Sequence, residues 1–345
     1  MEKKVLMKEN LSKFINLLME FNDVYAPVKK DNNLSYQKIT NPDEIYLKFL
    51  NTKIPPKSIF FPQKEVLFKY EKINGEIKLS DTFEKSSSKI VFAIRPCDAR
   101  SFKLLDNFFA FGEFKDKLYM ERRKNSIIIG LGCNHPRSTC FCTSVKGSPF
   151  NKEDTDIFFT DLGDRYLVES ITDSGVNIIK NLNVLRDALN DEIIKAEVLS
   201  KKVIENMKDL FAIEVITQNL DEIYDNKMWK LLGDTCIGCG TCSFLCPTCH
   251  CFDVIDENIN KNKGQRVRLW DTCQFPLFTL HGSGHNPRPE KKERIRQRIY
   301  HKFNYYINNY DLCGCVGCGR CLISCPCNQD IREILQIICE GGCKI

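Results

Sequence analysis

Two cysteine runs near the C-terminus constrain this 345-residue chain more than any other feature. Both follow the spacing C-x2-C-x2-C-x3-C-P, which is typical of [4Fe-4S] cluster ligation. Closely spaced thiolates let a tight loop wrap a cluster, and glycines within the loop let the backbone approach it. The runs contain Cys236, Cys239, Cys242 and Cys246, followed by Cys315, Cys318, Cys321 and Cys325. The sequence therefore predicts two [4Fe-4S] clusters.

The fourth cysteine of each run is expected to bind the cluster of the other run, as in other proteins with two such motifs. The predicted ligand sets are Cys236, Cys239, Cys242 and Cys325 for one cluster, and Cys315, Cys318, Cys321 and Cys246 for the other. A zinc ribbon is the alternative for paired C-x2-C motifs. It needs only two cysteines in each half, so it leaves the other cysteines and the two following prolines unexplained.

Cysteine usage and charge restrict the cellular setting and the partners. The 19 cysteines are odd in number and fall in metal-type spacings, which argues against a disulfide framework. The N-terminus lacks the apolar core of a secretion signal, and no apolar stretch approaches the roughly 20 residues that span a bilayer. We expect a cytoplasmic protein from an anaerobic setting, without a membrane segment. The small net charge of +5 and the absence of a recognition motif argue against nucleic acid as a partner.

Apolar patterning predicts an α/β or α+β domain over residues 1–225 and a mainly helical, ferredoxin-like dicluster domain over residues 226–345. The dipeptide Asn74-Gly75 predicts a tight hairpin turn. Strands are predicted at 24–27, 66–70, 76–79, 88–94, 126–131, 156–160 and 166–169. Helices are predicted at 8–21, 37–50, 102–109 and over most of 176–220.

Four further cysteines lie in the first of these domains. Cys97 and Cys133 each follow a predicted buried strand, so their thiols emerge at one sheet edge if the strands are parallel neighbours. Cys140 and Cys142 lie on the loop that leaves Cys133 and can fold back over the same place. Four thiols suffice for a [4Fe-4S] cluster or for tetrahedral zinc, whereas a lone buried cysteine acts as a small apolar residue. We predict a third metal site here, with a cluster favoured over zinc.

Asp98, beside Cys97, has three interpretations: a metal ligand, a proton carrier, or the N-cap of the helix that follows. An N-cap is the most frequent role of such an aspartate. The basic segment 288–302 is predicted as a helix with a solvated face, and a surface that steers an acidic redox partner is the alternative.

Three cysteines beyond the first run leave two interpretations open. Cys249, Cys251 and Cys273, with His281 and His285 nearby in sequence, form an incomplete ligand set for a fourth cluster. They could equally line the first two clusters and tune them. The remaining cysteines, Cys313, Cys327, Cys339 and Cys343, are left unassigned.

Five segments of the chain occur in the order found in one known family. They are Arg95-Pro-Cys-Asp-Ala-Arg100, Cys133 with Thr139-Cys-Phe-Cys142, Asp161-Leu-Gly-Asp-Arg-Tyr166, Cys246-Pro-Thr-Cys-His-Cys251 and Trp270-Asp-Thr-Cys-Gln274. The chain resembles the beta subunit of cytoplasmic nickel–iron sulfhydrogenases, which combine hydrogenase and sulfur reductase activities. It is more loosely similar to the corresponding subunit of anaerobic sulfite reductases. The resemblance covers nearly the whole chain, and Cys313 and Cys327 are additions to the family pattern.

The resemblance implies an electron-transfer subunit of a soluble hetero-oligomer, without a catalytic site of its own. The implied partners are an FAD- and NAD(P)-binding flavoprotein subunit and a catalytic subunit, either a hydrogenase or a sirohaem sulfite reductase. The sequence agrees, because it contains neither a glycine-rich phosphate loop nor a Ser/His/Asp constellation. One alternative is an oxidoreductase subunit that binds a flavin or deazaflavin near Cys97 and has its own substrate site. A redox-responsive regulatory protein is the third interpretation.

Overall fold

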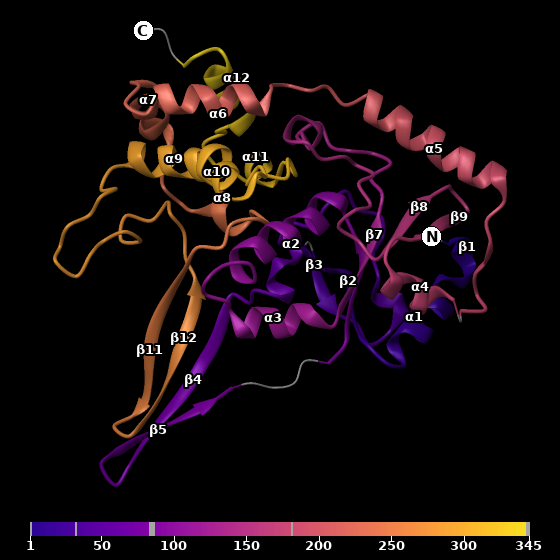
Figure 1. Cartoon of the computed structure of the whole chain (residues 1–345), viewed down its shortest axis with the longest axis horizontal. Helices are drawn as coiled ribbons and strands as arrows, with labels where there is room; N and C mark the ends of the chain where they lie inside the picture. The colour runs from indigo at the N-terminus through magenta and orange to yellow at the C-terminus, as the bar shows by residue number, and fades with distance from the viewer. Residues whose placement is uncertain (1, 32, 83–86, 181, 343–345) are drawn as a thin grey trace.

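A mixed eight-stranded sheet organises the first half of the protein (Figure 1). The computed structural model describes residues 2–31, 33–82, 87–180 and 182–342. The strands of the large sheet are β1 (Lys3–Met7), β2 (Asp23–Lys30), β3 (Asn33–Lys38), β6 (Lys89–Ile94), β7 (Ser126–Leu131), β8 (Ile157–Asp161), β9 (Arg165–Ser170) and β10 (Arg186–Asp187). Their order is β10-β1-β9-β8-β7-β6-β2-β3, with β2, β6, β7 and β8 parallel to one another and antiparallel pairs on both sides.

Helices cover both faces of this sheet, because its central strands are apolar on both sides. All six residues of β6 are buried. The helices of this part are α1 (Leu11–Met19), α2 (Pro96–Phe109), α3 (Lys117–Lys124), α4 (Asp173–Ile179) and α5 (Asn190–Glu205). On one face α1 and α4 pack on a core that includes Phe92 and Phe159, and on the other face α2 packs on Val91 and Ile128. Burial on two faces explains why these strands are continuous apolar runs.

The helix predicted at 37–50 is wrong. Residues 33–38 form β3, which pairs antiparallel with β2, and the chain then runs irregularly with one 3₁₀ turn at Pro42–Glu44. Ile45 makes a β-bridge to Val28 and packs on the sheet core together with Leu47. The apolar side chains of this segment are therefore buried from an extended backbone at the sheet edge.

A bulge ends β6 immediately before the predicted third metal site. The register between β6 and β7 shifts between Val91 and Ile94, and Ala93 has a left-handed φ of 58°. The Tyr36 hydroxyl donates a buried hydrogen bond to the Ala93 carbonyl (2.8 Å), which holds this unusual backbone in place. Bulges commonly redirect side chains beside functional sites. Here the bulge directs the chain into Arg95 and the first turn of α2.

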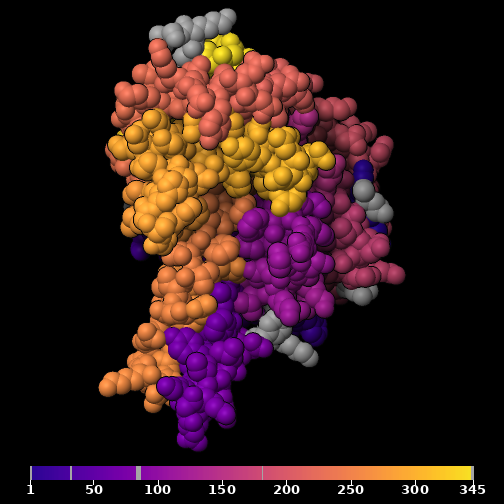
Figure 2. All heavy atoms as spheres, turned by 60° about the vertical axis from the view of Figure 1, so that its left-hand side comes forward, coloured from indigo at the N-terminus to yellow at the C-terminus, as the bar shows by residue number. Residues whose placement is uncertain are grey.

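A four-stranded antiparallel sheet projects from the body as an arm (Figures 1 and 2). Its strands are β4 (Lys64–Ile73), β5 (Glu76–Asp81), β11 (Phe252–Asn260) and β12 (Lys263–Trp270). The predicted Asn74-Gly75 hairpin is confirmed, since β4 and β5 pair across that turn and both turn residues have positive φ. The pairing of β12 with β4, far apart in the sequence, was not predicted.

Helices and cysteine loops make up the C-terminal part. Its helices are α6 (Ile213–Glu222), α7 (Met228–Thr235), α8 (Thr241–Phe244), α9 (Lys291–Tyr300), α10 (Tyr306–Tyr310), α11 (Arg320–Ile323) and α12 (Ile331–Cys339). A π-helical turn, His301–Tyr305, joins α9 to α10, and the shared core includes Trp229, Phe303 and Leu335. The predicted fold class, an α/β part followed by a helical dicluster part, is confirmed. The division at residue 225 stays a prediction. None of the described helices is both long and apolar enough to cross a membrane.

Candidate metal centres

The two cysteine runs line two neighbouring cavities in the crossed combination that their spacing predicts. The first, called the Cys236 cavity, has a volume of about 60 Å³. Its lining includes Cys236, Cys239, Cys242 and Cys325. The second, called the Cys315 cavity, has a volume of about 10 Å³ and includes Cys246, Cys315, Cys318 and Cys321 in its lining. Four thiols around each cavity fit the donor set of a [4Fe-4S] cluster, and the ligand assignments stay a prediction.

The loop backbones suit thiolate ligands, because their amides point at sulfur. The Gly238 N–H donates to the Cys236 sulfur (3.3 Å), and the Gly317 N–H donates to the Cys315 sulfur (3.4 Å). The Gln329 N–H donates in the same way to Cys325 (3.3 Å). Hydrogen bonds to sulfur stabilise the thiolate form and are one means by which proteins set cluster potentials.

Two buried cations lie beside these cavities without a carboxylate partner among the described residues. The ammonium of Lys302 donates to the Cys246 sulfur (3.3 Å), to the Thr248 hydroxyl (2.7 Å) and to the Gly314 carbonyl (2.9 Å). The guanidinium of Arg298 donates to the Cys242 carbonyl (2.9 Å) and reaches the Cys249 sulfur (3.5 Å). Burial alone would lower both pKa values, but the nearby thiolates outweigh it and hold them above their usual range. Buried cations of this kind require nearby negative charge, which thiolates and clusters supply.

Segment 288–302 was predicted as a helix whose basic face is solvated, and this is wrong for the basic side chains that face the protein interior. The predicted helix is present as α9, but Arg294, Arg298 and Lys302 are all buried. They recur every four residues beside the buried Ile295 and Ile299. That spacing was the available signal, since a polar residue on an apolar stripe is buried with the stripe.

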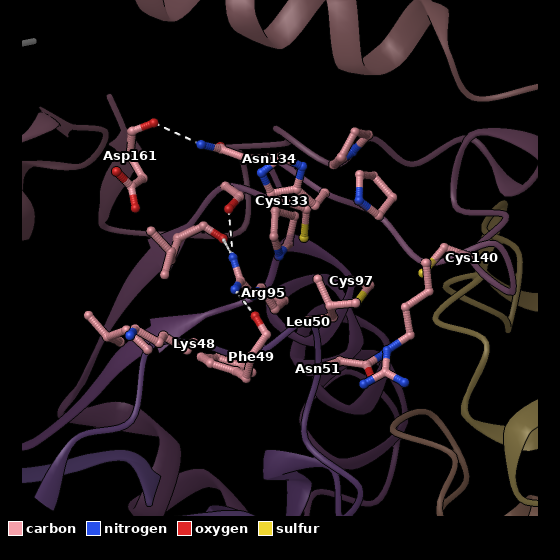
Figure 3. A pocket seen from close by; sticks show the side chains of 18 of the residues that line it. Lys48, Phe49, Leu50, Asn51, Arg95, Cys97, Cys133, Asn134, Cys140 and Asp161 are labelled. Carbon is pink, nitrogen blue, oxygen red and sulfur yellow. Dashed lines mark hydrogen bonds between the residues drawn. The ribbon is translucent and has the colours of Figure 1, made fainter. Parts of the chain in front are cut away.

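The four cysteines of the first part line a third cavity of about 660 Å³, called the Cys97 cavity (Figure 3). Cys97 lies in the first turn of α2 after β6, and Cys133 follows β7. Cys140 and Cys142 come from the loop after β7. The parallel pairing of β6 with β7 meets the condition set in the sequence analysis, and it brings the two strand ends to one edge.

Arg95 lies at the centre of the Cys97 cavity with only 7% of its surface exposed. It donates to the carbonyls of Gly132 (2.6 Å) and Phe49, and its guanidinium lies over the Phe49 ring at 4.5 Å. Burial raises the pKa of the Cys133 thiol, and the Arg95 charge partly offsets that increase. Burial also raises the pKa of Cys142 to about 12. Metal binding here would release protons, since the ligands must be thiolates.

Asp98 serves as an ion-pair partner and not as the helix cap. Arg95 occupies the N-cap position of α2, and the fully buried Asp98 carboxylate accepts two hydrogen bonds from Arg320 (2.6 and 2.7 Å). Arg320 also donates to the Thr52 carbonyl (2.7 Å). This ion pair joins the first turn of α2 to the second cysteine loop.

The second cysteine loop packs directly against the Cys140–Cys142 segment. The Phe141 N–H donates to the Gly317 carbonyl (2.9 Å). A Cβ atom at Gly317 would lie 2.5 Å from the Phe141 and Cys142 backbone, and the φ of Gly317 is +63°. Only glycine allows this approach, and it places Cys318 in the lining of both the Cys315 cavity and the Cys97 cavity.

The three cysteines after the first run lie at the edge of the predicted cluster region. Cys249 and Cys246 share a hydrogen bond that, together with Lys302, makes Cys246 the more acidic thiol. Cys251 donates to Cys273, and hydrogen bonds from Cys251 and the Gln274 amide lower the pKa of Cys273 to about 6. His281 and His285 are exposed on a loop. Both interpretations of these cysteines, a fourth cluster and a tuning role, stay open.

The other unassigned cysteines are dispersed. Cys313 is buried and its thiol points to the Lys302 carbonyl at 3.8 Å, whereas Cys327 lines the Cys236 cavity. Cys339 ends α12, and Cys343 lies outside the described residues. Over the ranges that the structure describes, no three His, Cys, Asp or Glu side chains converge as the ligands of a single ion would. The thiols surround cavities instead.

Comparison with known proteins agrees with this geometry. Residues 235–329 match the family model described as a 4Fe-4S dicluster domain, which implies two [4Fe-4S] clusters. The chain is 32% identical over 337 residues to sulfhydrogenase 2 subunit beta of Pyrococcus furiosus (strain ATCC 43587 / DSM 3638 / JCM 8422 / Vc1). The similarity covers 97% of this chain and 98% of that protein, and no solved structure matches. The chain therefore belongs to the sulfhydrogenase beta-subunit family, and it contains a 4Fe-4S dicluster domain.

Proposed function

We propose that this chain is the electron-transfer subunit of a cytoplasmic oxidoreductase complex. It relays electrons between an FAD- and NAD(P)-binding flavoprotein subunit and a catalytic subunit of the hydrogenase or sirohaem sulfite reductase type. The observation that carries the proposal is the continuous row of three thiol-lined cavities. Bound [4Fe-4S] clusters supply one-electron oxidation and reduction.

Shared walls make the row continuous. Cys321 and Arg298 line both the Cys236 cavity and the Cys315 cavity. Cys318 lines both the Cys315 cavity and the Cys97 cavity. The residues proposed as ligands are Cys236, Cys239, Cys242 and Cys325, then Cys246, Cys315, Cys318 and Cys321, then Cys97, Cys133, Cys140 and Cys142. Since neighbouring centres share a wall, no gap separates them.

The two ends of the row reach the surface, which suits contact with two partners. Cys239 is exposed, whereas its counterpart in the second loop, Cys318, is 8% exposed. At the other end the Cys97 cavity opens beside the exposed Lys48. A middle centre sealed from solvent and two accessible ends are what a relay subunit in a hetero-oligomer requires. The relative is named as a subunit, which supports that assembly for this chain.

The chain's own residues set the charge of the relay. Lys302 and Arg298 lie beside the Cys315 and Cys236 cavities, where they favour the more negative, reduced state of whatever the thiolates hold. Hydrogen bonds to sulfur act in the same direction. These contacts are positioned before any electron arrives, so they influence the direction of flow without a conformational change.

The test is iron and acid-labile sulfide per chain in anaerobically purified protein. We expect about twelve irons, from three clusters of four, and uptake of about three electrons in a coulometric titration. Cys239→Ala and Cys140→Ala should each lower the iron content by about four. Cys339→Ala, which changes a thiol on α12 outside the three cavity linings, is the matched control. Unchanged iron in Cys239→Ala would contradict the ligand assignment, and about eight irons in the wild type would remove the third cluster.

A further inference from the structure

The Cys97 cavity is far larger than a four-thiol site needs. Its volume is about 660 Å³, against about 60 and 10 Å³ for the two cavities lined by the cysteine runs. Each lining includes the four cysteines predicted to bind the same kind of centre. The larger cavity therefore has room for a second occupant, and its volume lies within the range of about 300–1,000 Å³ that is typical of small-molecule sites.

The thiols occupy only one side of this cavity. Figure 3 shows Cys97, Cys133 and Cys140 toward one side and Lys48, Phe49 and Asp161 toward the other, with Arg95 between them. The side away from the thiols is formed by the segment around Lys48 and by the β8–β9 hairpin. Space remains there after the thiols have bound their metal centre.

The charge of the cavity lining favours an anion. Five cationic side chains line the cavity against one carboxylate, Asp161; the cations are Lys8, Lys29, Lys48, Arg95 and Arg137. Lys8 already pairs with Asp161 (2.8 Å). Within the described part of the chain, Lys48 has no acidic partner. A low-dielectric cavity lined by one sign of charge concentrates ligands of the opposite sign.

Buried polar atoms without partners point to a missing ligand. Arg95 is more than nine-tenths buried, and its Nε has no hydrogen-bond partner. Asn134 Oδ1 is also buried and unpartnered, and Asn134 lines the cavity. Such groups are normally satisfied in a native protein, so an occupant that accepts from Arg95 and donates to Asn134 explains both.

Aromatic rings add a preference for a planar molecule. Tyr46, Phe49 and Tyr166 line the same side, with Lys29 over the Tyr46 ring (5.3 Å) and Lys8 over the Tyr166 ring (5.1 Å). Aromatic walls beside fixed cations suit a flat ring system that carries a phosphate.

We propose that the Cys97 cavity binds a flavin-type mononucleotide, with its phosphate at the lysine rim and its ring between the aromatic walls and the thiols. The redox role of this ligand rests on the proposed function, but its binding does not. The site would place a two-electron carrier at the end of the row of one-electron centres.

The experiment titrates anaerobic holoprotein with flavin mononucleotide and follows the flavin fluorescence. Saturable one-to-one binding is expected, with riboflavin binding more weakly because it lacks the phosphate. Lys48→Glu should weaken binding of the mononucleotide about tenfold or more, since it reverses a charge beside the phosphate. Lys30→Glu, an exposed lysine of β2 outside the cavity lining, is the matched control and should bind as the wild type does.

Iron content measured on the same samples separates this inference from the proposed function. Twelve irons without saturable mononucleotide binding would overturn the inference and leave the relay intact. Binding with only about eight irons would support the inference and remove the third cluster. Equal affinity of Lys48→Glu and Lys30→Glu would also overturn the proposed orientation of the phosphate.

Discussion

The tandem cysteine loops and the Cys97 cavity present four thiols each in two different ways. In the loops, three thiols come from seven consecutive residues, and only the fourth crosses from the other loop. In the Cys97 cavity, the thiols come from a helix start, a strand end and a connecting loop. The loops enclose small cavities, whereas the assembled site encloses about 660 Å³.

This difference separates what is fixed locally from what depends on packing. A seven-residue loop with glycines at positive φ fixes the spacing of its own thiols. The Cys97 site exists only if β6 and β7 lie side by side and the second cysteine loop closes its wall. Changes that loosen the contact between the two parts should therefore damage the Cys97 site first and leave the loops less affected.

The largest effect is expected from the buried ion pair between Asp98 and Arg320. Asp98→Asn leaves the Arg320 charge buried and unpaired, which should cost about 3–5 kcal/mol of unfolding free energy. Thermal unfolding of the anaerobic holoprotein measures the loss of unfolding free energy, and iron analysis shows whether iron is lost as well. Asp256→Asn, in the exposed pair with Arg266 on the arm, should cost no more than about 1 kcal/mol.

The double variant Asp98→Leu with Arg320→Met separates loss of charge from loss of packing. If the uncompensated charge is the cause, the double variant should be more stable than Asp98→Asn alone, since it leaves no charge unpaired. A double variant as unstable as the single one would show that the ion pair also positions the two parts.

A smaller effect is expected at the glycine contact between the parts. Gly317→Ala places a Cβ 2.5 Å from the backbone of the Cys142 loop, whereas Gly238→Ala meets only the Gln274 carbonyl at 3.6 Å. Both glycines have a positive φ, so both variants carry about 1 kcal/mol of backbone strain. Gly317→Ala should cost about 1–3 kcal/mol more because of the clash. Equal unfolding free energies would mean that the contact adjusts without cost.

Local patterns predicted the parts of the molecule that form locally. Spacing alone grouped the eight loop cysteines into the two sets that line the two small cavities. Two apolar runs, followed by Cys97 and Cys133, predicted the strands that are present as β6 and β7. The Asn-Gly turn predicted the β4–β5 hairpin. In each case the information lies within a few residues, because turn geometry and alternation are short-range properties.

Long-range packing could not be predicted in the same way. The pairing of β12 with β4 joins segments about 200 residues apart, and nothing in either strand specifies its partner. The Asp98–Arg320 pair and the burial of Arg298 depend on surfaces that exist only after folding. The helix predicted at 37–50 failed for the same reason, since the edge of the sheet buries its apolar residues in extended form.

The smallest expected effect tests whether Lys302 influences the redox potential of the centres in the cysteine loops alone. Lys302→Met removes a buried cation that contacts Cys246 but keeps the length of the side chain. The reduced state carries more negative charge, so the potential of the centre in the Cys315 cavity should fall by on the order of 50 mV, which corresponds to about 1.2 kcal/mol.

An EPR-monitored redox titration measures this change in potential. Lys291→Met, at the exposed start of the preceding helix α9, is the matched control and should leave the potential unchanged. Because Lys302 lines the Cys315 cavity and not the Cys97 cavity, the centre proposed for the latter should shift less. An equal shift in the potentials of both centres would mean that Lys302 acts on the whole row. The cysteine loops and the Cys97 site would then differ in how they are built but not in how a buried charge affects them.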